Sequence, residues 1–163
     1  MQYVLKQNLV SLGNNFTIKD IEGRDAFRVR GALATLGDKL SFEDMEGNEL
    51  LYIEQKVFNW VGMYEIRREG RLVAEVRRKL GVFLRRRFTV EMSGAEDLEM
   101  TGDILAFEYV VTRGGRKVAT FTRQWLRLSD TYWIRIADDE PDTQLILTLA
   151  VIIEVIANRR HNY

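Results

Sequence analysis

The sequence contains no cysteine and only one histidine among its 163 residues. Without cysteine the chain has no disulfides, thiolate metal sites or cysteine nucleophiles, and this composition suits a reducing cytosol. The one histidine, His161, lies in a basic tail. There is no G-x-S-x-G elbow, phosphate loop or dinucleotide fingerprint. We therefore expect a non-enzymatic protein without a cofactor.

The chain also lacks an excess of either charge, because 24 basic residues face 24 acidic ones. A global electrostatic attraction to nucleic acid is therefore absent, and we expect no nucleic-acid partner. The longest apolar run, Leu145–Ala157, has 13 residues and contains Glu154, whereas a transmembrane helix needs about 20. The N-terminus does not resemble a secretory signal. These absences predict a cytoplasmic protein that can attach peripherally to a membrane but does not span it.

What the sequence does contain is a repeat of 24 residues. Four segments open with an alternating apolar–polar–apolar triplet: Phe16–Ile18, Leu40–Phe42, Tyr64–Ile66 and Phe88–Val90. Alternation places the apolar side chains on one face of a strand, and a glycine six or seven residues after each opening suits a tight turn. Each unit is therefore predicted to be a β-hairpin with its connection.

The hairpins continue to Ile136, which gives about 11 or 12 strands, more than an open twisted sheet usually holds. We expect them to close into a barrel, because closure removes exposed edges. The run Leu145–Ala157 breaks the alternation and is apolar on every side. Acidic residues before it and basic residues after it favour a helix. A helix apolar all round must be buried all round, so we place it, at about residues 143–157, in the lumen of the barrel.

This combination resembles the tubby C-terminal-like fold, and the local sequence is most similar to the LURP-one-related family. The segments that carry the resemblance are Tyr3–Gln7, Phe16–Gly23, Gly37–Gly47, Leu51–Lys56, Tyr64–Ile66, Ala74–Lys79, Arg87–Val90 and Thr143–Ala157. The resemblance implies a single domain over residues 1–163, mainly β, with a closed antiparallel β-barrel of about 12 strands around a C-terminal hydrophobic helix. It also implies a relation to tubby, which binds phosphoinositide headgroups, and to membrane-associated phospholipid scramblases. The cysteine-rich and transmembrane segments of the scramblases have no counterpart here.

The candidate site is a basic stretch between residues 67 and 87, where nine arginines and lysines accompany only two glutamates. Arginine binds phosphate oxygens through paired hydrogen bonds, so this stretch could recognise an anionic phospholipid or phosphoinositide headgroup. The candidate ligand-binding residues are Arg67, Arg68, Arg77, Arg78, Lys79, Arg85 and Arg87. The alternative is a solvated face balanced by the acidic stretch 91–108, in a protein-interaction or structural module with no lipid ligand.

Two acidic features remain. Asp138, Asp139, Glu140 and Asp142 precede the predicted helix. They could bind calcium, but their spacing fits no EF-hand loop, and capping of the helix explains them more simply. Glu154 lies within the apolar run, and a buried carboxylate must be paired or neutralised. We expect its partner to be an arginine or a hydroxyl from an inward-facing strand position.

Overall fold

The computed structural model describes residues 1–7, 15–32, 37–56, 63–79, 85–103, 108–126 and 129–159. These residues form twelve strands and one helix. The strands are β1 (Gln2–Gln7), β2 (Phe16–Asp20), β3 (Asp25–Gly31), β4 (Lys39–Glu43), β5 (Glu49–Lys56), β6 (Met63–Arg68), β7 (Arg71–Lys79), β8 (Arg85–Met92), β9 (Leu98–Asp103), β10 (Glu108–Arg113), β11 (Arg116–Leu126) and β12 (Ser129–Ile136), and the helix is α1 (Thr143–Arg159).

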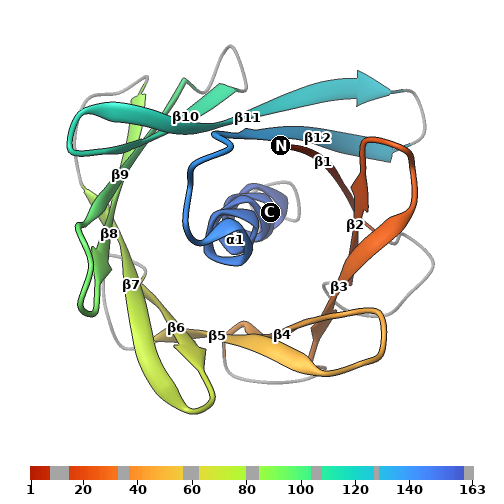
Figure 1. Ribbon diagram of the computed structural model, residues 1–163, viewed down its shortest axis with the longest axis horizontal. Coiled ribbons are helices and arrows are strands. Elements are labelled where there is room, and N and C mark those ends of the chain that lie inside the picture. Colours follow the sequence, from red (N-terminus) through yellow and green to blue (C-terminus); the bar gives the residue numbers. More distant parts are fainter. Residues whose placement is uncertain are drawn as a thin grey trace.

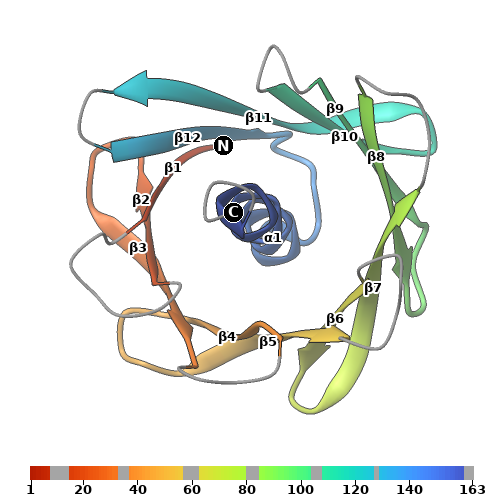
Figure 2. The ribbon, with the colours of Figure 1, turned by 180° about the vertical axis from the view of Figure 1, so that it is seen from behind.

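The strands form a closed barrel in which every strand pairs with its neighbours in the chain. All pairs are antiparallel, and β1 closes the barrel by pairing with β12, with Leu5 opposite Tyr132. Figures 1 and 2 show the ring of strands with α1 along its centre. The predicted closed antiparallel barrel of about 12 strands around a C-terminal helix is confirmed.

The four repeated triplets supply paired core residues on β2, β4, β6 and β8. In each triplet the first and third side chains are buried, from Phe16 and Ile18 to Phe88 and Val90. β2 begins at the opening residue, β4 and β6 begin one residue earlier, and β8 begins three residues earlier, at Arg85. The repeat therefore marks which side chains enter the core more accurately than it marks where strands begin.

The turn after β2 shows why aspartate and glycine recur at fixed positions. The backbone N–H groups of Glu22 and Arg24 donate to the Asp20 carboxylate at 2.9 Å. The Gly23 N–H donates to the Asp20 carbonyl at 3.0 Å, and Gly23 adopts a positive φ of 82°. Asp44 closes the next hairpin in the same way. A tight turn at each of these glycines was predicted from the 24-residue repeat.

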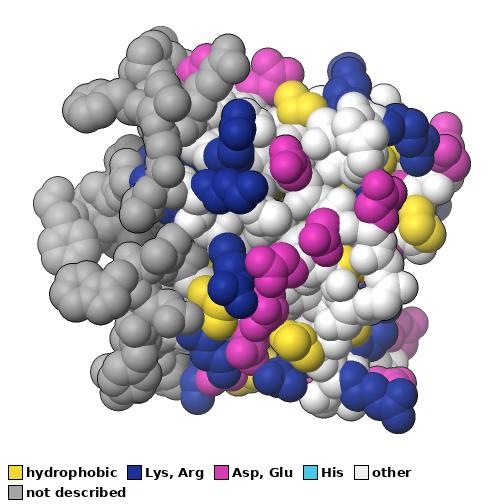
Figure 3. Space-filling model, turned by 90° about the vertical axis from the view of Figure 1, so that its left-hand side faces the viewer, with side chains coloured by type: hydrophobic (Ala, Val, Ile, Leu, Met, Phe, Trp, Pro, Cys, Tyr) yellow, Lys and Arg dark blue, Asp and Glu magenta, His cyan; other side chains and the backbone are white. Residues whose placement is uncertain are grey.

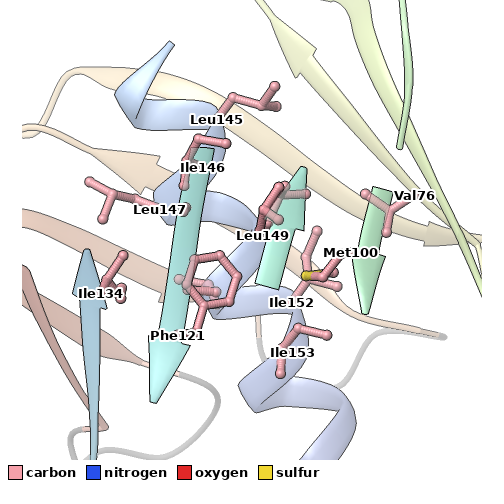
Figure 4. Packing of buried hydrophobic residues seen from close by; sticks show 14 of the residues in the cluster. Val76, Met100, Phe121, Ile134, Leu145, Ile146, Leu147, Leu149, Ile152 and Ile153 are labelled. Carbon is pink, nitrogen blue, oxygen red and sulfur yellow. The ribbon is translucent and has the colours of Figure 1, made fainter. Parts of the chain in front are cut away.

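Helix α1 fills the lumen. Every residue from Leu145 to Val155 is buried, including the polar Thr148 and Glu154. Figure 4 shows apolar side chains of α1 in one buried cluster with Val76 of β7, Met100 of β9, Phe121 of β11 and Ile134 of β12. The helix thus buries all its faces because strands surround it. No helix among the residues described has both the length and the apolarity to cross a bilayer.

Gly102 of β9 leaves room for an aromatic side chain in the lumen. It lies opposite Tyr109 of β10, and a Cβ atom on Gly102 would be 2.0 Å from Cε1 of that ring. Gly102→Ala should therefore push the ring aside and lower the free energy of unfolding by about 1–3 kcal/mol, measured by chemical denaturation. The double variant Gly102→Ala, Tyr109→Ala should lose less stability than the sum of the two single variants, because the two changes share one contact. Unchanged stability of Gly102→Ala would contradict this packing.

Candidate functional site

The barrel divides the basic stretch between its two faces. Ala74 and Val76 of β7 and Phe88 and Val90 of β8 point into the lumen. By alternation, the half-buried Arg78 and Arg86 share that inner face. The outer face carries Arg67, Arg71, Arg77, Lys79 and Arg87. Arg85 begins β8, and its side chain lies outside the described part of the structure. The expected single basic surface is therefore only partly assembled.

Four glutamates lie side by side on the outer face of β5–β8. The register places Glu54 opposite Glu65, Glu65 opposite Glu75, and Glu75 opposite Glu91. We call this set the glutamate row. Like charges directly opposite each other destabilise a sheet, so the row needs cations beside it. Figure 3 shows acidic and basic side chains interspersed on the side of the barrel that it views.

Arg67 and Arg77, two of the candidate residues, provide that compensation. Arg67 is 2.6 Å from Glu65, and Arg77 is 3.0 Å from Glu75 and 3.6 Å from Glu91. Burial alone would raise the pKa of Glu65, but hydrogen bonds from Arg67 and Lys56 outweigh it and lower that pKa. Both arginines are thus balanced by acids, as the alternative interpretation expected. Two of these three acids, Glu65 and Glu75, lie on β6 and β7, and only Glu91 belongs to the acidic stretch 91–108 that was expected to supply them.

Lys79 and Arg87 remain on the outer face. They lie directly opposite each other across β7 and β8, and both are exposed. Neither forms a salt bridge with any residue in the described ranges. Two cations held opposite each other repel, and an anion bound between them would relieve that repulsion. This pair is the part of the predicted site that the barrel brings together.

Arg68 has a structural partner at the start of the helix. Its Nη2 donates to both oxygens of Asp142, at 3.0 and 2.9 Å. Asp142 also accepts a hydrogen bond from the Leu145 N–H at 3.1 Å, which is the geometry of a helix N-cap. The capping interpretation of Asp142 is confirmed, and Arg68 links the cap to β6 rather than to the surface that Lys79 and Arg87 share.

The other acids before α1 also pair with cations. Arg113 of β10 donates to Glu140 at 2.7 Å, and the Glu140 side chain is fully buried. Arg116 of β11 donates to the exposed Asp139, also at 2.7 Å. The amino group of Met1 lies 2.5 Å from Asp138. These pairs hold the connection between β12 and α1 against β10, β11 and the residue before β1, a role that was not predicted for this acidic cluster.

Glu154 faces a polar group of the lumen. Burial and the negative charge of Glu154 raise the pKa of the Tyr132 phenol well above its usual value. Arg123, on the neighbouring strand β11, lies over the Tyr132 ring with Cζ 5.7 Å from its centroid. The Tyr132 hydroxyl on an inward-facing position of β12 therefore fits the partner expected for Glu154.

A groove of about 660 Å³ lies on the outer face of β11 and β12. Its lining includes Trp133 and Arg135 of β12 together with Thr120 and Thr122 of β11. The Trp133 side chain is 38% exposed. The alternation of side chains along β12 already indicates that Trp133 points outward, because Trp133 and Arg135 flank the buried Ile134 and must share the outer face.

Comparison with known proteins identifies the family. The family model described as LURP-one-related matches residues 1–154. The chain is 30% identical over 156 residues to the uncharacterized protein YxjI of Bacillus subtilis, covering 96% of this chain and 93% of that protein. It also resembles the X-ray structure of a protein from Arabidopsis thaliana, with a TM-score of 0.69 at 20% identity over 96% of this chain and 91% of the other, a likeness in fold. The chain belongs to the LURP-one-related family.

Proposed function

We propose that this barrel is a non-enzymatic binding protein that recognises anionic phospholipid or phosphoinositide headgroups on the outer face of β7 and β8. The observation that carries the proposal is the exposed pair Lys79 and Arg87, directly opposite each other and without an acidic partner in the described ranges. A phosphate group accepts hydrogen bonds from both side chains and neutralises their repulsion.

The glutamate row limits where a headgroup can bind. Arg77 is two residues from Lys79 on the same face, but it is held by Glu75 and Glu91. Negative charge therefore borders the pair on the side of the hairpin turn between β6 and β7. A membrane surface would have to approach from the opposite end of these strands, where β7 ends at Lys79 and β8 begins at Arg85.

The barrel also supports a proposal for the wider superfamily of this protein and for its place in the cell. The closed barrel around a C-terminal helix supports a relation to the tubby C-terminal-like proteins and phospholipid scramblases, some of which act at membranes. It fits a cytoplasmic protein that attaches peripherally, through a surface patch. A protein-interaction or structural module with no lipid ligand is the competing function, and vesicle binding separates the two.

The test is charge reversal of the pair. Lys79→Glu with Arg87→Glu should abolish sedimentation with vesicles that contain phosphatidylserine or a phosphoinositide, since each basic contact near an anionic surface contributes about 1 kcal/mol. Raising the salt concentration should weaken binding of the unmodified protein in the same way, because exposed charges are screened. Vesicles of phosphatidylcholine alone provide the baseline.

The matched control is Arg28→Glu with Arg71→Glu. It changes the net charge by the same amount at exposed positions away from the pair, so it should leave most of the binding intact. Equal loss in both double variants would mean that net charge, not this site, drives attachment. No sedimentation of the unmodified protein at physiological salt would favour the competing function.

A further inference from the structure

We propose that the groove on β11 and β12 is a second binding site, for a nucleoside phosphate, with the base stacked on Trp133 and the phosphates on Arg135 and Lys117. This site lies on a different side of the barrel from the Lys79–Arg87 pair (Figure 1). The volume of about 660 Å³ is within the range of small-molecule sites. All lining residues fall within the described ranges.

The aromatic part of the groove is Trp133. Among the described residues it is the most exposed aromatic side chain, at 38%. Thr122 lies opposite it on β11 and Val4 on β1, so small side chains flank the indole on both sides. An accessible indole between small neighbours offers a flat π surface, on which any nucleobase can stack.

The cationic part lies in one direction along the strands from Trp133. Arg135 is two residues away on the same face, which is about 7 Å along a strand. Thr120 and Gln2 lie opposite Arg135 on the neighbouring strands and can hydrogen-bond to a phosphate or sugar. Lys117 is further in that direction, near the start of β11. Neither cation forms a salt bridge within the described part of the chain.

The groove is therefore polarised along its length. Cations gather at the end near Ile136, whereas Glu108 lies opposite Thr122, level with Trp133. A carboxylate there can accept hydrogen bonds from the exocyclic amino group of a base, while guanidinium and ammonium groups bind phosphate. A nucleotide has the same order of groups: an amino-bearing aromatic ring at one end and phosphates at the other. An uncharged sugar would leave both cations without a partner.

The test uses isothermal titration calorimetry with adenosine diphosphate, adenosine and inorganic pyrophosphate. Adenosine diphosphate should bind at least about tenfold more tightly than either fragment, because only it uses both ends of the groove. Binding should also quench the fluorescence of Trp133, which Trp133→Phe would remove while the other two tryptophans report any general change. No binding of adenosine diphosphate at millimolar concentration would overturn the proposal.

Variants assign the contacts. Arg135→Gln, at an exposed position, should weaken adenosine diphosphate about tenfold and leave adenosine unchanged. Trp133→Leu should weaken both by a similar factor. The control Arg28→Gln removes an exposed cation on β3, outside the groove, and should change neither affinity.

Two further outcomes would overturn the proposal. If pyrophosphate binds as tightly as adenosine diphosphate, or if Arg28→Gln weakens binding as much as Arg135→Gln, the attraction is only electrostatic and the groove is not a nucleotide site. Vesicle binding through Lys79 and Arg87 does not depend on this groove, so either proposal can fail without the other.

Discussion

Replacing Ile152 with aspartate is expected to prevent the protein from folding. Ile152 is fully buried in α1, and strands of the barrel surround that helix on every side (Figures 1 and 2). An unpaired carboxylate in a dry core costs several kcal/mol, which is comparable to the whole stability of a domain of this size. We expect loss of soluble expression, or loss of the cooperative thermal transition measured by circular dichroism.

Ile21→Asp is the matched control. Ile21 is 66% exposed in the turn between β2 and β3, so the same substitution should change stability little. A milder core variant, Leu149→Ala, should fold but lose roughly 2–5 kcal/mol through the cavity it leaves. A soluble Ile152→Asp variant with an unchanged melting temperature would refute central burial of the helix.

Arg113→Met is expected to cause the second largest loss, about 3–5 kcal/mol in the free energy of unfolding. It removes the partner of Glu140, whose side chain is fully buried 2.7 Å from the guanidinium. The methionine preserves much of the packing but also removes the 2.8 Å hydrogen bond from Arg113 to the Glu96 carbonyl, so the uncompensated carboxylate accounts for most of the loss and not all of it. Chemical denaturation of the purified variant measures it.

Two further variants test whether the buried Glu140 carboxylate causes this loss of stability. Glu140→Gln in the Arg113→Met background should recover much of the stability, because a neutral amide costs far less to bury than a charge. Arg116→Met breaks an exposed ion pair of the same length with Asp139 and should cost no more than about 1 kcal/mol. If Arg113→Met were as mild as Arg116→Met, the buried pair would not be what holds the connection before α1.

Local patterns in the sequence were enough to predict most of the fold. Phe16 and Ile18 enter the core because side chains alternate along a strand, and this rule needs no knowledge of the neighbouring strands. Asp20 and Gly23 define their turn through hydrogen bonds that span four residues or fewer. The helix was equally visible, since an apolar run with acidic residues before it leaves few other conformations.

The candidate site was harder to predict, because it depends on which residues of different strands lie opposite each other. Glu54, Glu65, Glu75 and Glu91 have no regular spacing in the sequence, yet the register aligns them in one row. That row binds Arg67 and Arg77 and leaves Lys79 and Arg87 as the exposed pair. Connections of unequal length between the strands set this alignment, so counting charges along the chain could not reveal it.

By itself the sequence determined the hairpins, their core faces and the helix that fills the lumen, because periodicity and turn chemistry act over a few residues. Tertiary structure decided which charges are compensated and which surfaces are open. Arg68 meets Asp142 across 74 positions of the chain, and Trp133 and Thr122 share a groove only because β11 and β12 pair in one register. Such contacts depend on closure of the whole barrel, in which every strand fixes the position of the next.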